Sequence, residues 1–184
     1  SSTAIEHESV LKSAQELEKR GFEVVYLEPD SKGGISEEQI FEAVNDKTIL
    51  VSMMYVNNEI GSVLPVSSIK KAVKRANAPA LVHIDCVQAY SKIPIKPETL
   101  GADLISVSAH KIHGAKGVGA LYIRKGVRIL PMLFGGEQEK RIRPGTQAAP
   151  LIAGFGKAAE LIPDYDEQKR KIEELSAYAK SELE

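Results

Sequence analysis

Apolar runs of strand length alternate with helix-like segments along most of this 184-residue chain. The run at 48–55 (TILVSMMY) is almost continuously apolar, which is typical of a strand covered on both faces of a sheet. The segments 8–20 and 66–77 place apolar residues at helical spacing, and Gly21 follows the first as a stop signal. Alternation of this kind predicts an α/β fold with a mostly parallel sheet and helices on both faces.

The remaining segments extend the same alternation. The other expected strands are 22–27, 80–85, 103–109 and 117–124, and the other expected helices are 36–44 and 165–184. The length indicates a single domain with a substantial core.

Composition excludes several classes of function. Lys plus Arg is 24 and Asp plus Glu is 25, so a net charge of −1 gives no basic surplus for nucleic acid or anionic membranes. The single cysteine allows no intrachain disulfide. No apolar run reaches the roughly 18 residues of a membrane span, and the first residues lack the order of a signal peptide. We therefore expect a cytoplasmic protein that binds neither nucleic acid nor membrane.

Polar side chains follow three of the expected strands at their carboxyl ends. They are Asn57 and Asn58 after the first, Asp85 at the end of the second, and Ser108, His110 and Lys111 after the third. Ligands of open α/β sheets bind at this edge, so we expect the site there.

Lys111 and Asp85 form a chemically suggestive pair. A lysine at a strand end can form an imine, and an aspartate facing a pyridine nitrogen is the other group that pyridoxal phosphate (PLP) requires. From the local pattern alone, Lys111 could equally be a surface lysine in a glycine-rich turn, and Asp85 a helix N-cap.

Five segments together carry a specific resemblance. They are EHESVL (6–11), VNNEIG (56–61), HIDCVQA (83–89), SAHKIHGAKGVGALYIRKG (108–126) and GGEQEKRIRPGTQ (135–147). In this order they resemble the NifS/IscS-type cysteine desulfurases, which are PLP enzymes of fold type I in the class V aminotransferase family. The NNEIG and HKIHG segments favour this branch over the SufS-like enzymes and the selenocysteine lyases.

The resemblance implies roles around the cofactor ring. Lys111 would form the Schiff base with the cofactor, and Asp85 would pair with the pyridine nitrogen. Gln88 and Asn58 would hydrogen-bond the phenolic oxygen. His7 would stack on the ring and move protons, which makes Lys111 and His7 the expected catalytic residues.

The resemblance also implies a phosphate site and no metal. Ser108 and His110 would bind the cofactor phosphate, and Thr146 would reach the phosphate of the neighbouring subunit in a homodimer. Cys86 follows Asp85 in the wrong motif for a nucleophile, so we expect it to pack as a small hydrophobic residue.

The implied reaction converts L-cysteine to L-alanine. Its sulfur would pass to an enzyme cysteine persulfide, and from there to a sulfur-acceptor or scaffold protein for iron–sulfur clusters or thio-modification. The family's N-terminal phosphate loop and its C-terminal small domain, with the catalytic cysteine and a substrate-binding arginine, have no counterpart in residues 1–184. We therefore expect a partial large domain that is inactive in isolation.

Two other interpretations remain open. The chain could belong to another class V aminotransferase or lyase, against which the NNEIG and HKIHG segments weigh. It could also be a non-catalytic scaffold with a PLP fold, although a scaffold would need none of Asp85, Gln88 and Lys111.

Overall fold

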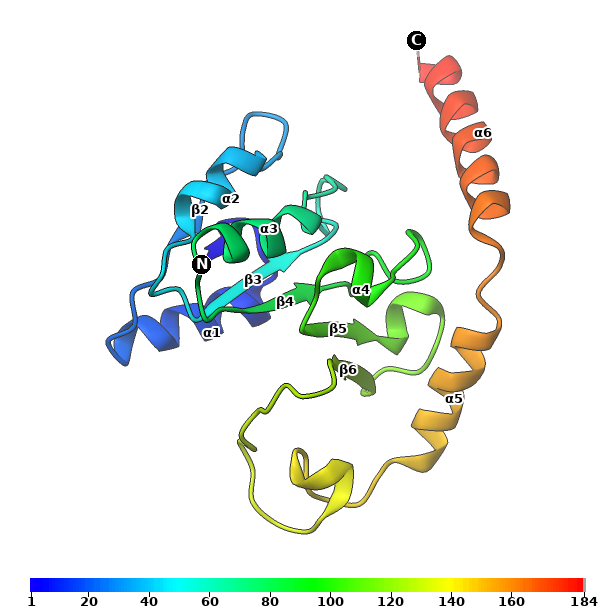
Figure 1. Cartoon of the computed structure of the whole chain (residues 1–184). Helices are drawn as coiled ribbons and strands as arrows, with labels where there is room; N and C mark the ends of the chain where they lie inside the picture. Colours follow the sequence, from blue (N-terminus) through cyan, green and yellow to red (C-terminus); the bar gives the residue numbers. More distant parts are fainter. Residues whose placement is uncertain (184) are drawn as a thin grey trace.

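The central element is a four-stranded sheet with strand order β3-β4-β5-β6 (Figure 1). The structure, a computed structural model, describes residues 1–183. The strands are β3 (Leu50–Met54), β4 (Leu81–Asp85), β5 (Leu104–Ser108) and β6 (Gly119–Ile123). The pairs β3–β4 and β4–β5 are parallel, and β6 is antiparallel to β5. The prediction of an α/β fold with a mostly parallel sheet is confirmed.

A small parallel pair lies beside β3. It consists of β1 (Ser2–Thr3) and β2 (Tyr26–Leu27), and the Ser52 N–H donates to the Ser1 carbonyl at 3.0 Å. The strand expected at 22–27 is therefore in the right place but too long. Its partner has only two residues, so only a short ladder can form.

Helices occupy most of the connections. They are α1 (Glu8–Lys19), α2 (Glu37–Ala43), α3 (Ser67–Arg75), α4 (Pro97–Leu100), α5 (Ala149–Glu160) and α6 (Tyr165–Leu183), with short 3₁₀ turns η1 (Ala109–Ile112) and η2 (Gln138–Arg141). The four expected helices agree with α1, α2, α3 and α6 to within two residues at each end, although Glu184 lies outside the described residues. Sequence reasoning missed α5, whose two glycines each weaken helix propensity by about 1 kcal/mol.

The two faces of the sheet differ in character. Val51 and Met53 of β3 and Ile84 of β4 point to one face and pack in the same core as Ile69 and Val73 of α3. Alternation along β3 places its side chains on opposite faces. Helix α3 covers the apolar face, so burial there holds α3 to the sheet.

The opposite face carries a polar chain across three strands. Ser52 Oγ lies 2.7 Å from His83 Nδ1, and His83 Nε2 lies 2.8 Å from Ser106 Oγ. Burial lowers the pKa of His83, although the Asp85 charge opposes the shift. Helix α1 faces this side across a cavity of about 660 Å³, which Leu50 and Ser52 line together with α1.

Helix α6 projects away from the sheet (Figure 1). Near its start, Gln168 Nε2 donates to the Ser91 carbonyl at 3.3 Å. No helix within residues 1–183 combines the length and apolarity needed to cross a bilayer.

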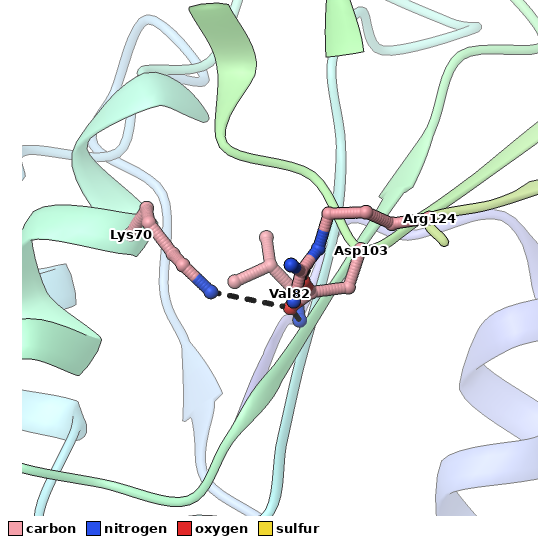
Figure 2. Close-up of polar contacts among 4 residues, drawn as sticks. All are labelled: Lys70, Val82, Asp103 and Arg124. Atoms are coloured by element: carbon pink, nitrogen blue, oxygen red, sulfur yellow. Dashed lines mark hydrogen bonds and ion pairs between the residues drawn. The ribbon is translucent and has the colours of Figure 1, made fainter. Parts of the chain in front are cut away.

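A buried carboxylate stabilises the edge of the sheet opposite to the carboxyl ends of β3, β4 and β5. Figure 2 shows its contacts. Asp103 precedes β5 and is only 1% exposed. Its Oδ1 pairs with Arg124 Nη2 at 2.6 Å, and its Oδ2 contacts Lys70 Nζ at 3.4 Å. The Val82 N–H also donates to Oδ2 at 2.8 Å. One side chain therefore joins α3, β4 and the end of β6.

Removal of this carboxylate should cost stability. We expect Asp103→Ala to lower the free energy of unfolding by about 3 kcal/mol, because two cations and a buried N–H lose their partner. Urea denaturation measures the change. The exposed Asp46→Ala should change the same quantity by less than about 0.5 kcal/mol. Equal effects of the two variants would show that the contacts of Asp103 do not stabilise this edge of the sheet.

Candidate active site

Parallel pairing brings the carboxyl ends of β3, β4 and β5 to one edge of the sheet. The main-chain N–H of Tyr55, just past β3, donates to the Asp85 carbonyl at 2.9 Å. We call the polar residues at and after these strand ends, together with His7 before α1, the rim. The rim holds seven of the eight residues expected at the site: His7, Asn58, Asp85, Gln88, Ser108, His110 and Lys111.

Asp85 ends β4 and is 9% exposed. Its Oδ1 accepts the Val87 N–H at 2.9 Å, so Asp85 caps a turn and not a helix N-terminus, which was the alternative for this residue. No helix starts there, and no salt bridge reaches Asp85 within residues 1–183. A buried carboxylate with one hydrogen bond and no cation is a good partner for a positively charged ligand atom.

Lys111 lies in η1, directly after β5. The turn closes through His113 in the left-handed region at φ 66°. The position of Gly114 favours glycine, because a Cβ there would lie only 3.0 Å from both Cβ and O of Ala109. Burial, and then the charge of Lys111, lower the pKa of Lys92. Lys111 itself is exposed and forms no salt bridge within the described chain, so its amine is available to a ligand.

His7 caps the N-terminus of α1. Its Nδ1 accepts the Ser9 N–H at 3.2 Å and lies 2.8 Å from Ser9 Oγ. Because Nδ1 accepts, the proton of the neutral ring is assigned to Nε2. Capping and a second role at Nε2 are therefore compatible.

The other rim side chains differ in whether they already have a hydrogen-bond partner. Ser108 Oγ and His110 Nδ1 lie 2.7 Å apart, which pairs the two groups expected at the phosphate. The amide side chains of Asn58 and Gln88 have no hydrogen-bond partner within residues 1–183, so both could bind a ligand.

Thr146 is not brought to the rim by this chain. It is exposed in the loop between η2 and α5, and the segment between β6 and α5 extends beyond the β6 edge of the sheet (Figure 1). Its expected contact with a neighbouring subunit stays a prediction.

Sequence reasoning assigned no role to two buried residues near the rim. Glu6 is 5% exposed and Asn57 is 6% exposed. Burial raises the pKa of Glu6 from 4.5 to about 7. The Asp85 charge acts in the same direction, and hydrogen bonds from Thr3 and Met54 oppose the shift. The available signal was position, since Glu6 directly precedes His7 and Asn57 directly precedes Asn58.

Cys86 lies inside the core and is 0% exposed. Burial, with the Asp85 charge, raises the pKa of its thiol to about 12. The expectation that Cys86 packs as a small hydrophobic residue is confirmed.

Comparison with known proteins identifies the family. The aminotransferase class-V family model matches residues 2–184. The chain belongs to the class-V aminotransferase family.

Individual relatives narrow the branch. A cysteine desulfurase IscS from Dictyoglomus turgidum is 43% identical over 98% of this chain and 45% of its own length. A mitochondrial cysteine desulfurase from Candida albicans is 45% identical over 98% of this chain and 37% of its own length. The chain thus spans less than half the length of these curated relatives.

Solved structures agree with these relatives. A NifS-like protein superimposes with a TM-score of 0.84 at 45% identity, covering 97% of this chain and 47% of that one. The structure described as SspA in complex with cysteine superimposes with a TM-score of 0.85 at 36% identity, covering 96% of this chain and 51% of that one.

Cys86 should resist thiol reagents. At pH 8 we expect no measurable reaction with Ellman's reagent in the folded chain, because a thiol with a pKa of about 12 supplies almost no thiolate. In urea the same thiol should react completely. The absorbance of the released thionitrobenzoate measures both states, and rapid labelling of the folded chain would contradict the burial.

Glu6 should make stability depend on pH. A pKa raised from 4.5 to about 7 means that the folded chain holds a proton that the unfolded chain releases between these values. Stability therefore falls as pH rises through this window. Relative to wild type, Glu6→Gln should gain up to about 3 kcal/mol between pH 4.5 and pH 7.5.

Urea denaturation at several pH values measures this difference. Glu8→Gln is the matched control, because the Glu8 side chain is 71% exposed and follows His7 directly. A flat difference between Glu6→Gln and wild type would show that the Glu6 carboxyl is not perturbed by folding.

Proposed function

We propose that this chain is the central part of the large domain of a PLP-dependent cysteine desulfurase. The observation that carries the proposal is the rim, where Asp85, without a cation, ends one strand and Lys111 follows the adjacent parallel strand. The names of the relatives support the same activity. An N-terminal segment and a small C-terminal domain would complete the enzyme, because the chain covers only 45% and 37% of the two curated desulfurases.

The rim residues fit the chemistry of PLP. Asp85 would hold the ring nitrogen in its protonated form, because its carboxylate has a free oxygen and no competing cation in the described chain. Lys111 would bind the aldehyde carbon, and the paired Ser108 and His110 would donate to the phosphate. The bound cofactor supplies an electron-withdrawing ring.

The remaining rim residues would orient the reactants and move protons. Asn58 and Gln88 would donate their amide N–H groups to the phenolic oxygen. His7 would exchange protons through Nε2, because its Nδ1 is occupied by Ser9. Lys111 forms no salt bridge in residues 1–183, so no carboxylate holds its side chain away from the cofactor.

The proposed reaction takes L-cysteine as substrate. The Cβ–S bond breaks, the sulfur passes to an enzyme thiolate as a persulfide, and the carbon skeleton takes up protons and leaves as L-alanine. Cys86 cannot be that thiolate, because it is buried and its thiol pKa is about 12. The nucleophile would belong to another part of the enzyme.

We also propose the assembly and its surroundings. The enzyme would be a homodimer in which Thr146 reaches the cofactor phosphate of the neighbouring subunit. It would work in the cytoplasm and deliver sulfur to an acceptor or scaffold protein, for iron–sulfur clusters or thio-modification.

Chemical trapping tests the proposal in the full-length enzyme. Borohydride reduction after addition of PLP should leave a pyridoxyl group on Lys111, which peptide mapping by mass spectrometry would locate. Lys111→Ala should lower the rate of alanine release from L-cysteine by at least about 10³-fold, because the covalent attachment point is lost.

Lys116→Ala is the matched control, since this lysine lies in the same glycine-rich turn beyond Gly114. It should retain activity within about three-fold. A pyridoxyl group on Lys92 or Lys116 would overturn the assignment of Lys111. Turnover of another amino acid without alanine formation from L-cysteine would favour a different class V aminotransferase or lyase.

A further inference from the structure

The two residues that precede His7 are fastened to the end of β3. Asn57 Nδ2 donates to the Ile5 carbonyl at 2.9 Å. The Met54 N–H donates to Glu6 Oε1 at 2.9 Å, and Thr3 Oγ1 donates to the same oxygen at 2.6 Å. The segment leading into His7 is therefore held at two successive residues, Ile5 by its main-chain carbonyl and Glu6 by its side chain.

These contacts are buried although His7 is exposed. Glu6 is 5% exposed and Asn57 is 6% exposed, whereas the hydrogen bonds of His7 to residues 1–183 are all local, to Ser9 and within α1. Glu6 Oε2 is buried without a partner in the described chain. A buried carboxyl that leaves one oxygen unsatisfied is costly, and an apolar side chain would avoid that cost if packing were the only requirement.

The anchor points lie beside Asp85. Met54 is the register partner of Asp85 across the β3–β4 pair, and the next N–H, that of Tyr55, donates to the Asp85 carbonyl. The loop before α1 is thus attached to the end of β3, the strand end that lies next to Asp85. The side chain of Asn57 contacts both loops. Its Nδ2 donates to the loop before α1, and its Oδ1 accepts the N–H groups of Glu59 and Ile60 in the loop after β3.

We propose that Glu6 and Asn57 form a clamp that positions His7 relative to Asp85. This inference rests on the proposed function, in which His7 and Asp85 act on one cofactor. Glu6 and Asn57 are positioning residues, because neither needs to touch the reacting atoms. The clamp sets the place of the His7 main chain, and the Ser9 cap sets the tautomer of its ring.

Variants at Glu6 separate the clamp from simple packing. In the full-length enzyme, Glu6→Gln keeps a carbonyl oxygen for both donors, whereas Glu6→Leu keeps the volume and removes the acceptor. We expect kcat to stay within about three-fold for Glu6→Gln and to fall by about ten-fold or more for Glu6→Leu. The matched control Glu8→Gln should leave kcat unchanged.

A double-variant cycle shows whether Glu6 acts through His7. In the His7→Ala background, Glu6→Leu should cause less than about a two-fold further loss, because the clamp has nothing left to position. A full ten-fold loss in both backgrounds would overturn the inference, and so would wild-type activity of Glu6→Leu. If Glu6→Leu fails to fold, Thr3→Val removes one donor to Glu6 Oε1 and should give a smaller loss that again disappears in the His7→Ala background.

Hydrogen exchange supplies a readout that does not depend on turnover. Amides in residues 5–11 and at Met54 should exchange faster in the cofactor-free Glu6→Leu protein and at the wild-type rate in Glu6→Gln. Unchanged exchange in Glu6→Leu would overturn the clamp. If the wild-type enzyme releases no alanine from L-cysteine while the exchange pattern appears as expected, the proposed function fails and the clamp stands.

Discussion

Parallel pairing of β3, β4 and β5 is the constraint on which the site depends. In parallel strands every carboxyl end lies at the same edge, so residues separated by more than fifty positions, such as Asn58 and Lys111, both belong to the rim. The crossovers then lie on the faces of the sheet, where α3 is held by apolar burial. The fold therefore assembles the candidate site from short segments that each need only a local turn.

The two edges of the sheet treat charge in opposite ways. At the amino edge of β5, Asp103 is neutralised by Arg124 and Lys70 and accepts a main-chain N–H. At the carboxyl edge of β4, Asp85 accepts one N–H and meets no cation in the described chain. The carboxylate at the edge without an expected ligand thus stabilises the fold through ion pairs. The carboxylate at the edge where we expect the ligand has no cationic partner in the described chain.

Much of this arrangement could be predicted because its signals are local. Helical spacing located α1, α2, α3 and α6, and strand ends followed by polar residues located the rim. The length of β2 and the presence of α5 could not be predicted. The first depends on a two-residue partner strand, and the second forms despite two glycines that lower its helix propensity.

The contacts of Glu6 and Asn57 escaped prediction for a different reason. They join residues about fifty positions apart, and no periodicity in either segment reports such a pairing. The polar chain through Ser52, His83 and Ser106 could not be predicted either. The sequence of β3 is an almost continuous apolar run, and only the sheet register shows that Ser52 lies beside His83.

Three carboxyl groups with little exposure show how burial is compensated in this chain. Asp103 is balanced by two cations. Glu6 has two donors on one oxygen and a pKa raised to about 7, so it can become neutral. Asp85 has one donor and no cation within residues 1–183, which leaves its charge the least compensated of the three. A cationic ring nitrogen would gain most at that position, because the same interaction at Asp103 would only exchange one ion pair for another.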